Sequence, residues 1–503
     1  MEEESLTTSL VKNSFWNFLM TLLSRIGGFI FVIIIARFLL PEKFGIYNLA
    51  MSIAIILFTF ADAGINQTLI RYFSEAIGKK NKKSALGVYN YLLKLKFLLT
   101  LLFSLSLIIF SYPLSYFIFN KPSLFLPLIF CSVYLFVASF ESFFESFFYI
   151  EKKVKYLATK QIIFEFSRIL GVLLLFLLFA KQYPVTGVIG VLVIALCFAL
   201  VYVFFNLKKI IPILFESPGE KLDKPDKRRI NSFLYYLIIG STLVIIFGYI
   251  DTIMIGLFLP SAFIGFYSAS LSLVMGFAAL LSVANVLLPI FTRLKKEKIN
   301  DAFNKVFKYT ALFAIPIIFG FFVLGNYIIS TLWGYEYLPA TLPLYFLAFL
   351  ILEIPVTNAL YSLFSAREKP KYFVNILIIS TIINIVLNYI LITSFLKISM
   401  DWAIAGAAIA TLISRYFYFA GLYFFANKKL KVSLNSQYLI KPFISSIIMA
   451  VILLLINAFI IKDMNLITGL GEVALGVLLY FLVMFLIKGV EKQDFYLIKE
   501  IIK

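Results

Sequence analysis

Apolar runs of about twenty residues recur along the whole 503-residue chain, and they constrain its fold more than any other feature. Each run is long enough to cross a hydrocarbon core of about 30 Å as a helix. A membrane β-barrel would instead show segments of about ten residues that alternate in polarity, and the sequence has no such alternation. Hydrophobic residues make up 62% of the chain and charged residues 14%, which is far from the balance of a soluble domain. The chain is therefore predicted to be an all-α integral membrane protein.

Charged breaks and Pro- or Gly-rich breaks divide the chain into about fourteen predicted transmembrane helices. The predicted spans are residues 14–38, 44–67, 87–110, 123–149, 155–180, 185–206, 232–258, 263–291, 306–331, 341–365, 372–395, 402–425, 438–461 and 465–488. The acidic N-terminal segment leads into the first run without a clear small-residue cleavage site. This run is therefore expected to remain in the protein as its first helix.

The positive charge of the chain is concentrated in loops. There are 45 Lys and Arg residues, and the formal net charge is +19. Such a charge can indicate nucleic-acid binding, but most of these residues lie in short loops on one predicted side of the membrane. The positive-inside rule therefore predicts a multi-pass protein of the cell membrane with both termini in the cytoplasm. Anionic membrane lipids are the expected partners of these loops, and no nucleic-acid partner is expected.

Residues that carry catalysis or bind metals are scarce. His, the commonest general base and metal ligand, is absent. Cys131 and Cys197 lie inside apolar runs, so neither a disulfide framework nor a thiolate metal cluster is expected. The predicted outer loops are short and contain no DxD pattern. The chain is therefore not expected to be an enzyme, and neither a cofactor nor a metal site is predicted.

Two turns of the chain carry similar sequences. FLLPEKFGIYNLAMS begins at Phe38, and LFLPSAFIGFYSASLS begins at Leu257. Three residue pairs match at offsets of 219 or 220: Pro41 with Pro260, Gly45 with Gly265, and Tyr47 with Tyr267. Pro and Gly break helices at any turn, so chance similarity is the alternative explanation. An even number of predicted spans separates the two copies. If the repeat is genuine, both lobes therefore have the same orientation in the bilayer. Such a parallel repeat supports transport by alternating access.

These features predict four parts of the chain. The parts are an N-lobe of six helices over 1–207, a cytoplasmic basic linker over 208–231, a C-lobe of six helices over 232–430, and two further helices with a cytoplasmic tail over 431–503. The linker is expected to be a solvated connector, and binding of anionic head groups is the alternative. The predicted fold has about fourteen transmembrane helices in two parallel-repeat six-helix lobes plus two C-terminal helices.

Three segments resemble a known family. They are SRIGGFIFVIIIARFLLPEKFGIYNLA from Ser24, YIDTIMIGLFLPSAFIGFYSAS from Tyr249, and INIVLNYILI followed by AIAGAAIATLISRY from Ile383. The chain resembles, over nearly its whole length, the polysaccharide transporter branch of the multidrug/oligosaccharidyl-lipid/polysaccharide exporter superfamily, which includes Wzx-type flippases. The resemblance includes the count of fourteen spans, both repeated turns, the helix of Asp251, and Asn384 and Asn388 ahead of the Gly406 segment.

The resemblance implies two six-helix lobes with two additional helices that together move lipid-linked saccharides across the membrane. Related murein-precursor flippases have a cationic central cavity for the pyrophosphate and a groove near the last two helices for the lipid tail. Only Arg25 carries over as a single residue, because its place in the first helix resembles that of a cavity arginine in those relatives.

Three arginines inside predicted spans are the candidates for substrate binding, because an ionised side chain in hydrocarbon costs at least about 2.5 kcal/mol and is expected to face a cavity or a partner. Arg25 lies about 16 Å along the first helix, near the midplane, where its planar guanidinium suits a pyrophosphate. A buried structural ion pair is the alternative. Arg168 is three residues from Glu165, so a local ion pair is equally compatible with its position. Arg415, about 20 Å into the twelfth span, is either an anion ligand or a helix-packing residue.

Three acids are the candidates for ion coupling or gating: Glu353, Asp251 and Glu165. Glu353 precedes Pro355 near mid-membrane, where desolvation makes proton binding possible. Asp251 lies toward the outer end of the seventh helix, so a gate or a lobe-locking hydrogen bond is as compatible with its position as ion coupling. Four other polar residues near inner helix ends are interpreted as solvated at the interface rather than as a site: Asp62, Asn66, Glu141 and Glu145.

Three functions from different classes remain for comparison. A membrane-embedded glycosyltransferase or ligase is disfavoured, because its chemistry would need a sizeable loop or domain. An ion-coupled exporter of cationic drugs is compatible with the acids inside the spans. The deep arginines, the fourteen spans and the family motifs favour a flippase for a polyprenyl-linked oligosaccharide that works by alternating access, with a proton or sodium as the possible coupling ion.

Overall fold

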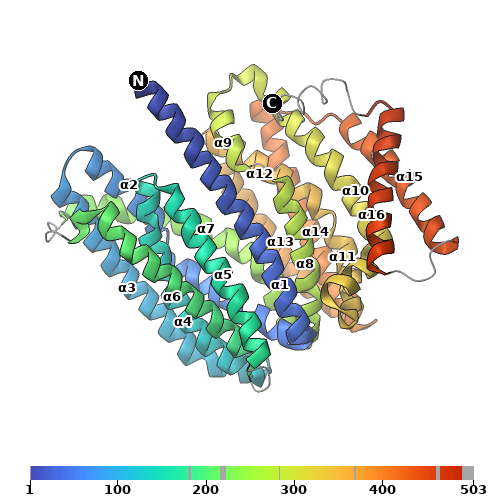
Figure 1. Cartoon of the computed structure of the whole chain (residues 1–503), viewed down its shortest axis with the longest axis horizontal. Helices are drawn as coiled ribbons and strands as arrows, with labels where there is room; N and C mark the ends of the chain where they lie inside the picture. The colour runs from blue at the N-terminus through green and yellow to red at the C-terminus, as the bar shows by residue number, and fades with distance from the viewer. Residues whose placement is uncertain are drawn as a thin grey trace. The chain divides into compact units, whose positions relative to one another are not determined.

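The computed structural model describes residues 2–178, 183–215, 222–282, 284–367, 370–459 and 465–489. Within these ranges the regular structure is helical and contains no strand (Figure 1). The chain divides into two compact units, Met1–Gly265 and Phe266–Lys503. Residues 216–221 of the predicted linker, the predicted tail from 490, and single residues or ends of the predicted spans 155–180, 263–291 and 438–461 lie outside the described residues.

The helices keep the order of the predicted spans. The first unit contains α1 (Glu2–Asp62), α2 (Ile65–Gly78), α3 (Lys82–Pro113), α4 (Phe125–Ile150), α5 (Val154–Leu178), α6 (Pro184–Ile210), α7 (Lys224–Phe258) and the start of α8 (Ser261–Leu281). The second unit contains the rest of α8, then α9 (Ala284–Arg293), α10 (Ile299–Trp333), α11 (Thr341–Leu347), α12 (Leu350–Ala366), α13 (Pro370–Leu396), α14 (Met400–Leu430), α15 (Gln437–Phe459) and α16 (Leu466–Leu486). Short helical turns join them at η1 (Leu114–Ile118), η2 (Pro122–Leu124), η3 (Pro212–Phe215), η4 (Lys296–Lys298) and η5 (Tyr335–Ala340).

The number of spans agrees with the prediction. The described residues hold 12 helices that are long and apolar enough to cross a membrane, or 13 when one bent pair is counted as a span. The first of them, Leu19–Gly78, has 60 residues and would be about 90 Å long if straight. It is interrupted at Leu40, whose φ of 59° is not helical and which precedes Pro41. This helix therefore accounts for two predicted spans, and the prediction of an all-α membrane protein with about fourteen spans is confirmed.

Two predicted spans are broken. The span predicted over 341–365 consists of α11 and α12, which are bent by 46° relative to each other. At the break, Ile351 N–H donates to the Ala348 carbonyl at 3.0 Å, an i to i−3 bond of a tighter helix. Pro355, one turn further on, has no N–H to donate, which weakens the regular ladder there. The span predicted over 263–291 likewise consists of α8 and α9.

Helix α7 begins inside the residues predicted as a linker. It starts at Lys224, after Asp223 at the N-cap position and with Pro225 in its first turn, a composition that favours helix initiation. Arg229 then pairs with Glu75 at 3.2 Å, which places the start of α7 next to α2 within the first unit. The pair is largely solvent-exposed and contributes little to stability by itself.

Apolar side chains fill the interior of the first unit and also cover its outer helix faces. Inside, Phe73 and Phe147 pack edge to face with ring centroids 5.2 Å apart, and both are buried. Outside, Phe117 is 71% exposed and Leu177 79% exposed. Helices α3, α4, α5 and α6 lie side by side in this unit (Figure 1). Apolar exposure of this kind is expected where helices face lipid.

The two repeated turns pack against each other in a reciprocal way. A β-carbon added at Gly45 would overlap the Ser261 carbonyl, and one added at Gly265 would overlap the Pro41 carbonyl. Each copy of the turn therefore presents its glycine to the backbone of the other copy. Only glycine allows two backbones to approach this closely, which is the physical reason for the matched glycines in the repeat.

Candidate functional site

Arg168 and Glu165 of α5 form a buried ion pair. Arg168 Nε lies 2.8 Å from Glu165 Oε2, and one terminal guanidinium nitrogen lies 2.5 Å from the same oxygen. Gln161 Nε2 donates to the other carboxylate oxygen at 2.9 Å, so both oxygens of Glu165 are occupied. The side chains are 13% and 9% exposed. The structure brings these two predicted site residues together as the local ion pair that their spacing allowed.

This ion pair packs on the first half of α1, the helix that carries Arg25. A β-carbon at Gly27 would overlap the Glu165 carboxylate, and one at Gly28 would lie 3.5 Å from the Arg168 guanidinium. The guanidinium also stacks 4.8 Å from the Phe31 ring centroid. Two consecutive glycines therefore let the charged pair of α5 come close to the backbone of α1, just beyond Arg25.

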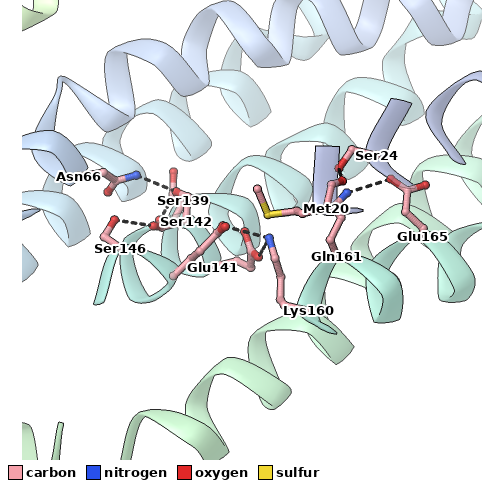
Figure 2. A network of polar contacts seen from close by, with 11 residues as sticks. Met20, Ser24, Asn66, Ser139, Glu141, Ser142, Ser146, Lys160, Gln161 and Glu165 are labelled. Carbon is pink, nitrogen blue, oxygen red and sulfur yellow. Dashed lines mark hydrogen bonds and ion pairs between the residues drawn. The ribbon is translucent and has the colours of Figure 1, made fainter. Parts of the chain in front are cut away.

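Lys160 of α5 joins two acids of α4. Its Nζ lies 2.8 Å from Glu141 Oε1 (Figure 2) and 3.0 Å from Glu145 Oε2. The three side chains are 9%, 7% and 16% exposed, respectively. Beside them, Asn66 of α2 donates to Ser142 of α4 at 3.1 Å. The interpretation of Glu141 and Glu145 as solvated interfacial groups is therefore wrong, because the helices bury them around a single lysine.

Asp62 pairs with a lysine that sequence reasoning had not singled out. Lys96 Nζ of α3 lies 2.6 Å from Asp62 Oδ1, and its side chain is 0% exposed. The Phe58 ring centroid lies 5.7 Å from the same nitrogen. The sequence did contain a sign of this pair, because Lys96 lies deep in the third predicted span and Asp62 lies near the end of the second. A charge inside a membrane requires a partner.

Glu353 lies just after the break between α11 and α12. It is 2% exposed, and Thr357 Oγ1 donates to its Oε1 at 2.6 Å. Its other oxygen, Oε2, is buried and receives no hydrogen bond from the described part of the chain. Arg415 of α14 is close enough to act on it electrostatically, so the structure brings these two candidates together as well. A buried carboxylate with one unoccupied oxygen can exchange a proton or hold a small cation.

The break itself is held by a neighbouring tyrosine. Tyr416, next to Arg415 on α14, donates its hydroxyl to the Phe349 carbonyl at 3.2 Å. Beside it on α14, Ser414 accepts a hydrogen bond from Asn384 of α13 at 3.0 Å, and both side chains are fully buried. The second unit thus contains a polar seam along α14.

Arg25 and Asp251 lie in the first unit. Arg25 is half-buried on α1, and Asp251 is 3% exposed near the end of α7. Both take part in polar or electrostatic interactions. Their assignment to substrate binding and to gating stays a prediction.

An apolar groove lies beside the last two helices. It has a volume of about 410 Å³ and is lined by side chains of α8, α10, α15 and α16, including Phe313, Ile328 and Val477. The lining residues of α10 extend over fifteen positions, or about 22 Å of helix. Glu472 of α16 is the charged residue among the groove's lining residues, and the Asn457 amide of α15 donates to it. Figure 1 shows α15 and α16 beside α10.

Comparisons with known proteins agree with this architecture. The family model described as polysaccharide biosynthesis protein matches residues 10–295. The uncharacterized membrane protein MJ1068 of Methanocaldococcus jannaschii is 24% identical over 520 residues, which cover 98% of this chain and 97% of that protein. The probable low-salt glycan biosynthesis flippase Agl15 of Haloferax volcanii is 26% identical over 203 residues, which cover 38% of this chain and 41% of that protein.

Solved structures share the fold. The lipid II flippase MurJ in an inward closed conformation superposes with a TM-score of 0.73 at 17% identity, covering 95% of this chain and 98% of that one. An inward-facing multidrug resistance MATE family transporter of the MOP superfamily gives a TM-score of 0.63 at 13% identity, covering 81% of this chain and 95% of that one. Since the family model matches more than half of its residues, this chain belongs to the polysaccharide biosynthesis protein family.

Proposed function

We propose that this transporter is a flippase that moves a polyprenyl-linked oligosaccharide, joined to its lipid by phosphate or pyrophosphate, from the cytoplasmic to the outer leaflet by alternating access. The apolar groove beside α15 and α16 carries the proposal. A groove with about 22 Å of apolar helix along it suits a long hydrocarbon tail. A compact drug molecule has no need of such a surface. The similarity to a probable glycan biosynthesis flippase supports the same substrate class.

Three arginines are proposed to bind the head group: Arg25, Arg168 and Arg415. A guanidinium offers five N–H donors in a planar fork, which matches the oxygens of a phosphate. Arg168 already uses two of its nitrogens on Glu165, so it has donors left for a ligand. Arg25 lies next to this pair along α1 and is proposed as the main pyrophosphate ligand.

Ion coupling and membrane orientation are part of the same proposal. Glu353 is proposed to take up the coupling ion, either a proton or sodium, because its buried Oε2 receives no hydrogen bond from the residues that the structure describes. Asp251 and Glu165 are proposed to gate the transport path. Both termini are proposed to lie in the cytoplasm of a cell-membrane protein, in keeping with the basic loops on that side.

A second candidate is an ion-coupled exporter of cationic small molecules. The buried acids favour it, since Glu353 and Glu472 are each 2% exposed and would attract a positive charge. The two functions differ in the charge and shape of the substrate. An exporter of this kind would not require a positive charge at Arg25.

Reconstitution of the full chain into vesicles tests the proposal. Outward movement of a fluorescent polyprenyl-pyrophosphate saccharide is measured beside movement of a cationic dye. The wild-type chain is expected to move the lipid-linked saccharide, and Arg25→Ala is expected to lose at least about tenfold in rate, because a charge-assisted phosphate contact contributes roughly 1.5–3 kcal/mol.

Arg37→Ala, a change of a second arginine on α1, serves as the matched control and is expected to keep the transport rate. Melting temperatures of both variants report folding. Dye movement without saccharide movement by the wild-type chain would establish the exporter instead. Unchanged saccharide transport by Arg25→Ala would exclude its role as head-group ligand.

A further inference from the structure

The helix that follows the first repeated turn breaks near its predicted inner end, and a side-chain hydrogen bond bridges the break. Ala63 and Gly64 have φ angles of 49° and 72°, so α1 gives way to α2 there. Two residues after Gly64, the Asn66 amide donates to the Ser142 hydroxyl of α4 at 3.1 Å (Figure 2). This bond joins the first turn of α2 to the fourth predicted span.

The second unit contains the same arrangement with the two residue types exchanged. Helix α8 ends at Leu281 and α9 begins at Ala284, so Ser282 lies in the break between them. The Asn358 amide of α12 donates to the Ser282 hydroxyl at 3.3 Å. In the first unit the asparagine is on the broken helix, and in the second unit the serine is.

The two hydrogen bonds occupy corresponding positions of the repeat. Each joins residues that are 76 positions apart in the sequence. Asn66 and Ser282 are 216 residues apart, and so are Ser142 and Asn358. This offset is shorter than that of the repeated turns by about one helical turn, so the residues keep the same face of the helix. The structure therefore extends the repeat from the turns to the helix breaks.

A further match one turn along the partner helices supports this correspondence. Ser146 donates its hydroxyl to the Ser142 carbonyl, and Ser362 donates to the Asn358 carbonyl, each at 2.9 Å. Both of these serines are buried, whereas the four bridging residues are all half-buried. A bond that recurs at equivalent positions with its residue types exchanged indicates that the bond itself, rather than either residue, is needed there.

We propose that the Asn66–Ser142 and Asn358–Ser282 hydrogen bonds are hinge clamps, which keep α2 and α9 attached to their own units during transport. Alternating access requires each unit to move as one body, whereas a helix break lets the segment beyond it move separately. The four residues are positioning residues, because they hold the chain and not the transported molecule. The inference goes beyond the proposed function and holds for a flippase and an exporter alike.

Hydrogen exchange of the purified full chain in detergent tests the clamp of the first unit. Asn66→Ala and Ser142→Ala are each expected to speed exchange of the α2 amides about threefold, which corresponds to about 0.6 kcal/mol, the average contribution of a hydrogen bond between membrane helices. Ser146→Ala is the matched control. Its hydroxyl bonds only within α4, so its loss should leave exchange of α2 as in the wild type.

The second unit supplies a sharper test, because it uses the same pair in the opposite order. The Asn66→Ser/Ser142→Asn double variant recreates in the first unit the arrangement of Ser282 and Asn358. It is expected to restore the wild-type exchange of α2. Ser142→Thr keeps the hydroxyl without exchanging the pair and is likewise expected to exchange as the wild type. Melting temperatures check that each variant is folded.

Transport in vesicles gives the functional readout. The Asn66→Ala/Asn358→Ala chain, which lacks both clamps, is expected to lose part of the wild-type transport rate, because α2 and α9 no longer follow their units. The substrate in this assay is the lipid-linked saccharide or the cationic dye, whichever the wild-type chain moves.

Three results would overturn the clamps: unchanged exchange of α2 in both single alanine variants, an equal effect of Ser146→Ala, or a full transport rate of the chain without clamps. Failure of both Ser142→Thr and the exchanged pair to restore exchange in folded protein would do the same. If the wild type moves no saccharide, the proposed function alone is rejected, since the exchange measurements do not depend on the substrate.

Discussion

Buried charges in the first unit occur with partners. Lys96 is balanced by Asp62, Arg168 by Glu165, and Lys160 by two acids. A charge taken out of water is stabilised only by a close partner, and removing one member of a buried pair typically costs about 3–5 kcal/mol. These residues are therefore expected to be sensitive to substitution for structural reasons, whatever else they do.

Glu353 of the second unit differs from these paired charges, because its Oε2 receives no hydrogen bond from the described residues and can bind another ligand. Glu353→Gln keeps the shape and an acceptor for Thr357 but cannot bind a proton or balance a cation. We expect the rate of saccharide movement by this variant to be independent of an imposed proton or sodium gradient, whereas the wild type responds to one of them. The measurement uses reconstituted vesicles with each gradient imposed separately.

Glu336→Gln, an exposed acid in η5 shortly before α11, is the control and should retain the gradient response. If the Glu353→Gln chain keeps the full gradient dependence of the wild type, Glu353 is not the coupling acid.

At the scale of elements, breaks in helices define the special positions of the fold. The kink at Leu40 and Pro41 turns α1 from the first span into the second. The bend between α11 and α12 lies just before Glu353, and the Phe349 carbonyl at the bend accepts hydrogen bonds from the Tyr416 hydroxyl and from the backbone N–H groups of Leu352 and Glu353. Non-helical backbone at membrane depth is tolerated only where other protein groups form hydrogen bonds with it. Such breaks are therefore candidates for functional positions.

The reciprocal turn contact leads to a stability prediction. Gly45→Ala would force a β-carbon into the Ser261 carbonyl, and since this is a backbone-to-backbone contact neither side can rotate away. We expect a loss of about 1–3 kcal/mol, seen as a lower melting temperature of the purified chain. Gly240→Ala on α7 meets no atom within 4 Å and should melt at or above the wild-type temperature. Equal melting of Gly45→Ala and wild type would contradict the close contact.

At the scale of the whole molecule, the surface is typical of an integral membrane protein. Apolar side chains are exposed on the helices, and basic residues lie in the loops. Leu177 and Phe117 are largely exposed on helices that are too apolar for water. Lys80 and its neighbours follow α2, in a loop that the positive-inside rule assigns to the cytoplasm. Lys397 follows α13, in a loop assigned to the opposite side.

Membrane orientation can be measured by labelling. In a background without Cys131 and Cys197, a membrane-impermeant maleimide is expected to label Lys397→Cys on intact cells. Lys80→Cys is expected to react only after permeabilisation. Both positions are exposed, so a difference in labelling reports the side of the membrane. The reverse pattern would place the termini outside the cytoplasm.

Part of the candidate site could be predicted from the sequence. The three-residue spacing of Glu165 and Arg168 allowed a local ion pair, which the structure contains. The partners of Asp62 and Glu141 could not be predicted, because Lys96 and Lys160 belong to other helices and the pairing depends on how those helices pack. The groove was expected only from the family resemblance, since its walls come from helices far apart in the sequence.

The sequence by itself determined that the chain lies in a lipid bilayer, how many times it spans that bilayer, and to which family it belongs. Hydropathy is a local property, and a bilayer requires each spanning segment to satisfy its own backbone hydrogen bonds, so a helix follows directly from an apolar run. Tertiary structure decided which charges are paired, where spans break and where the groove lies. Those outcomes depend on contacts between distant segments, such as Gly45 with Ser261, which no local pattern contains.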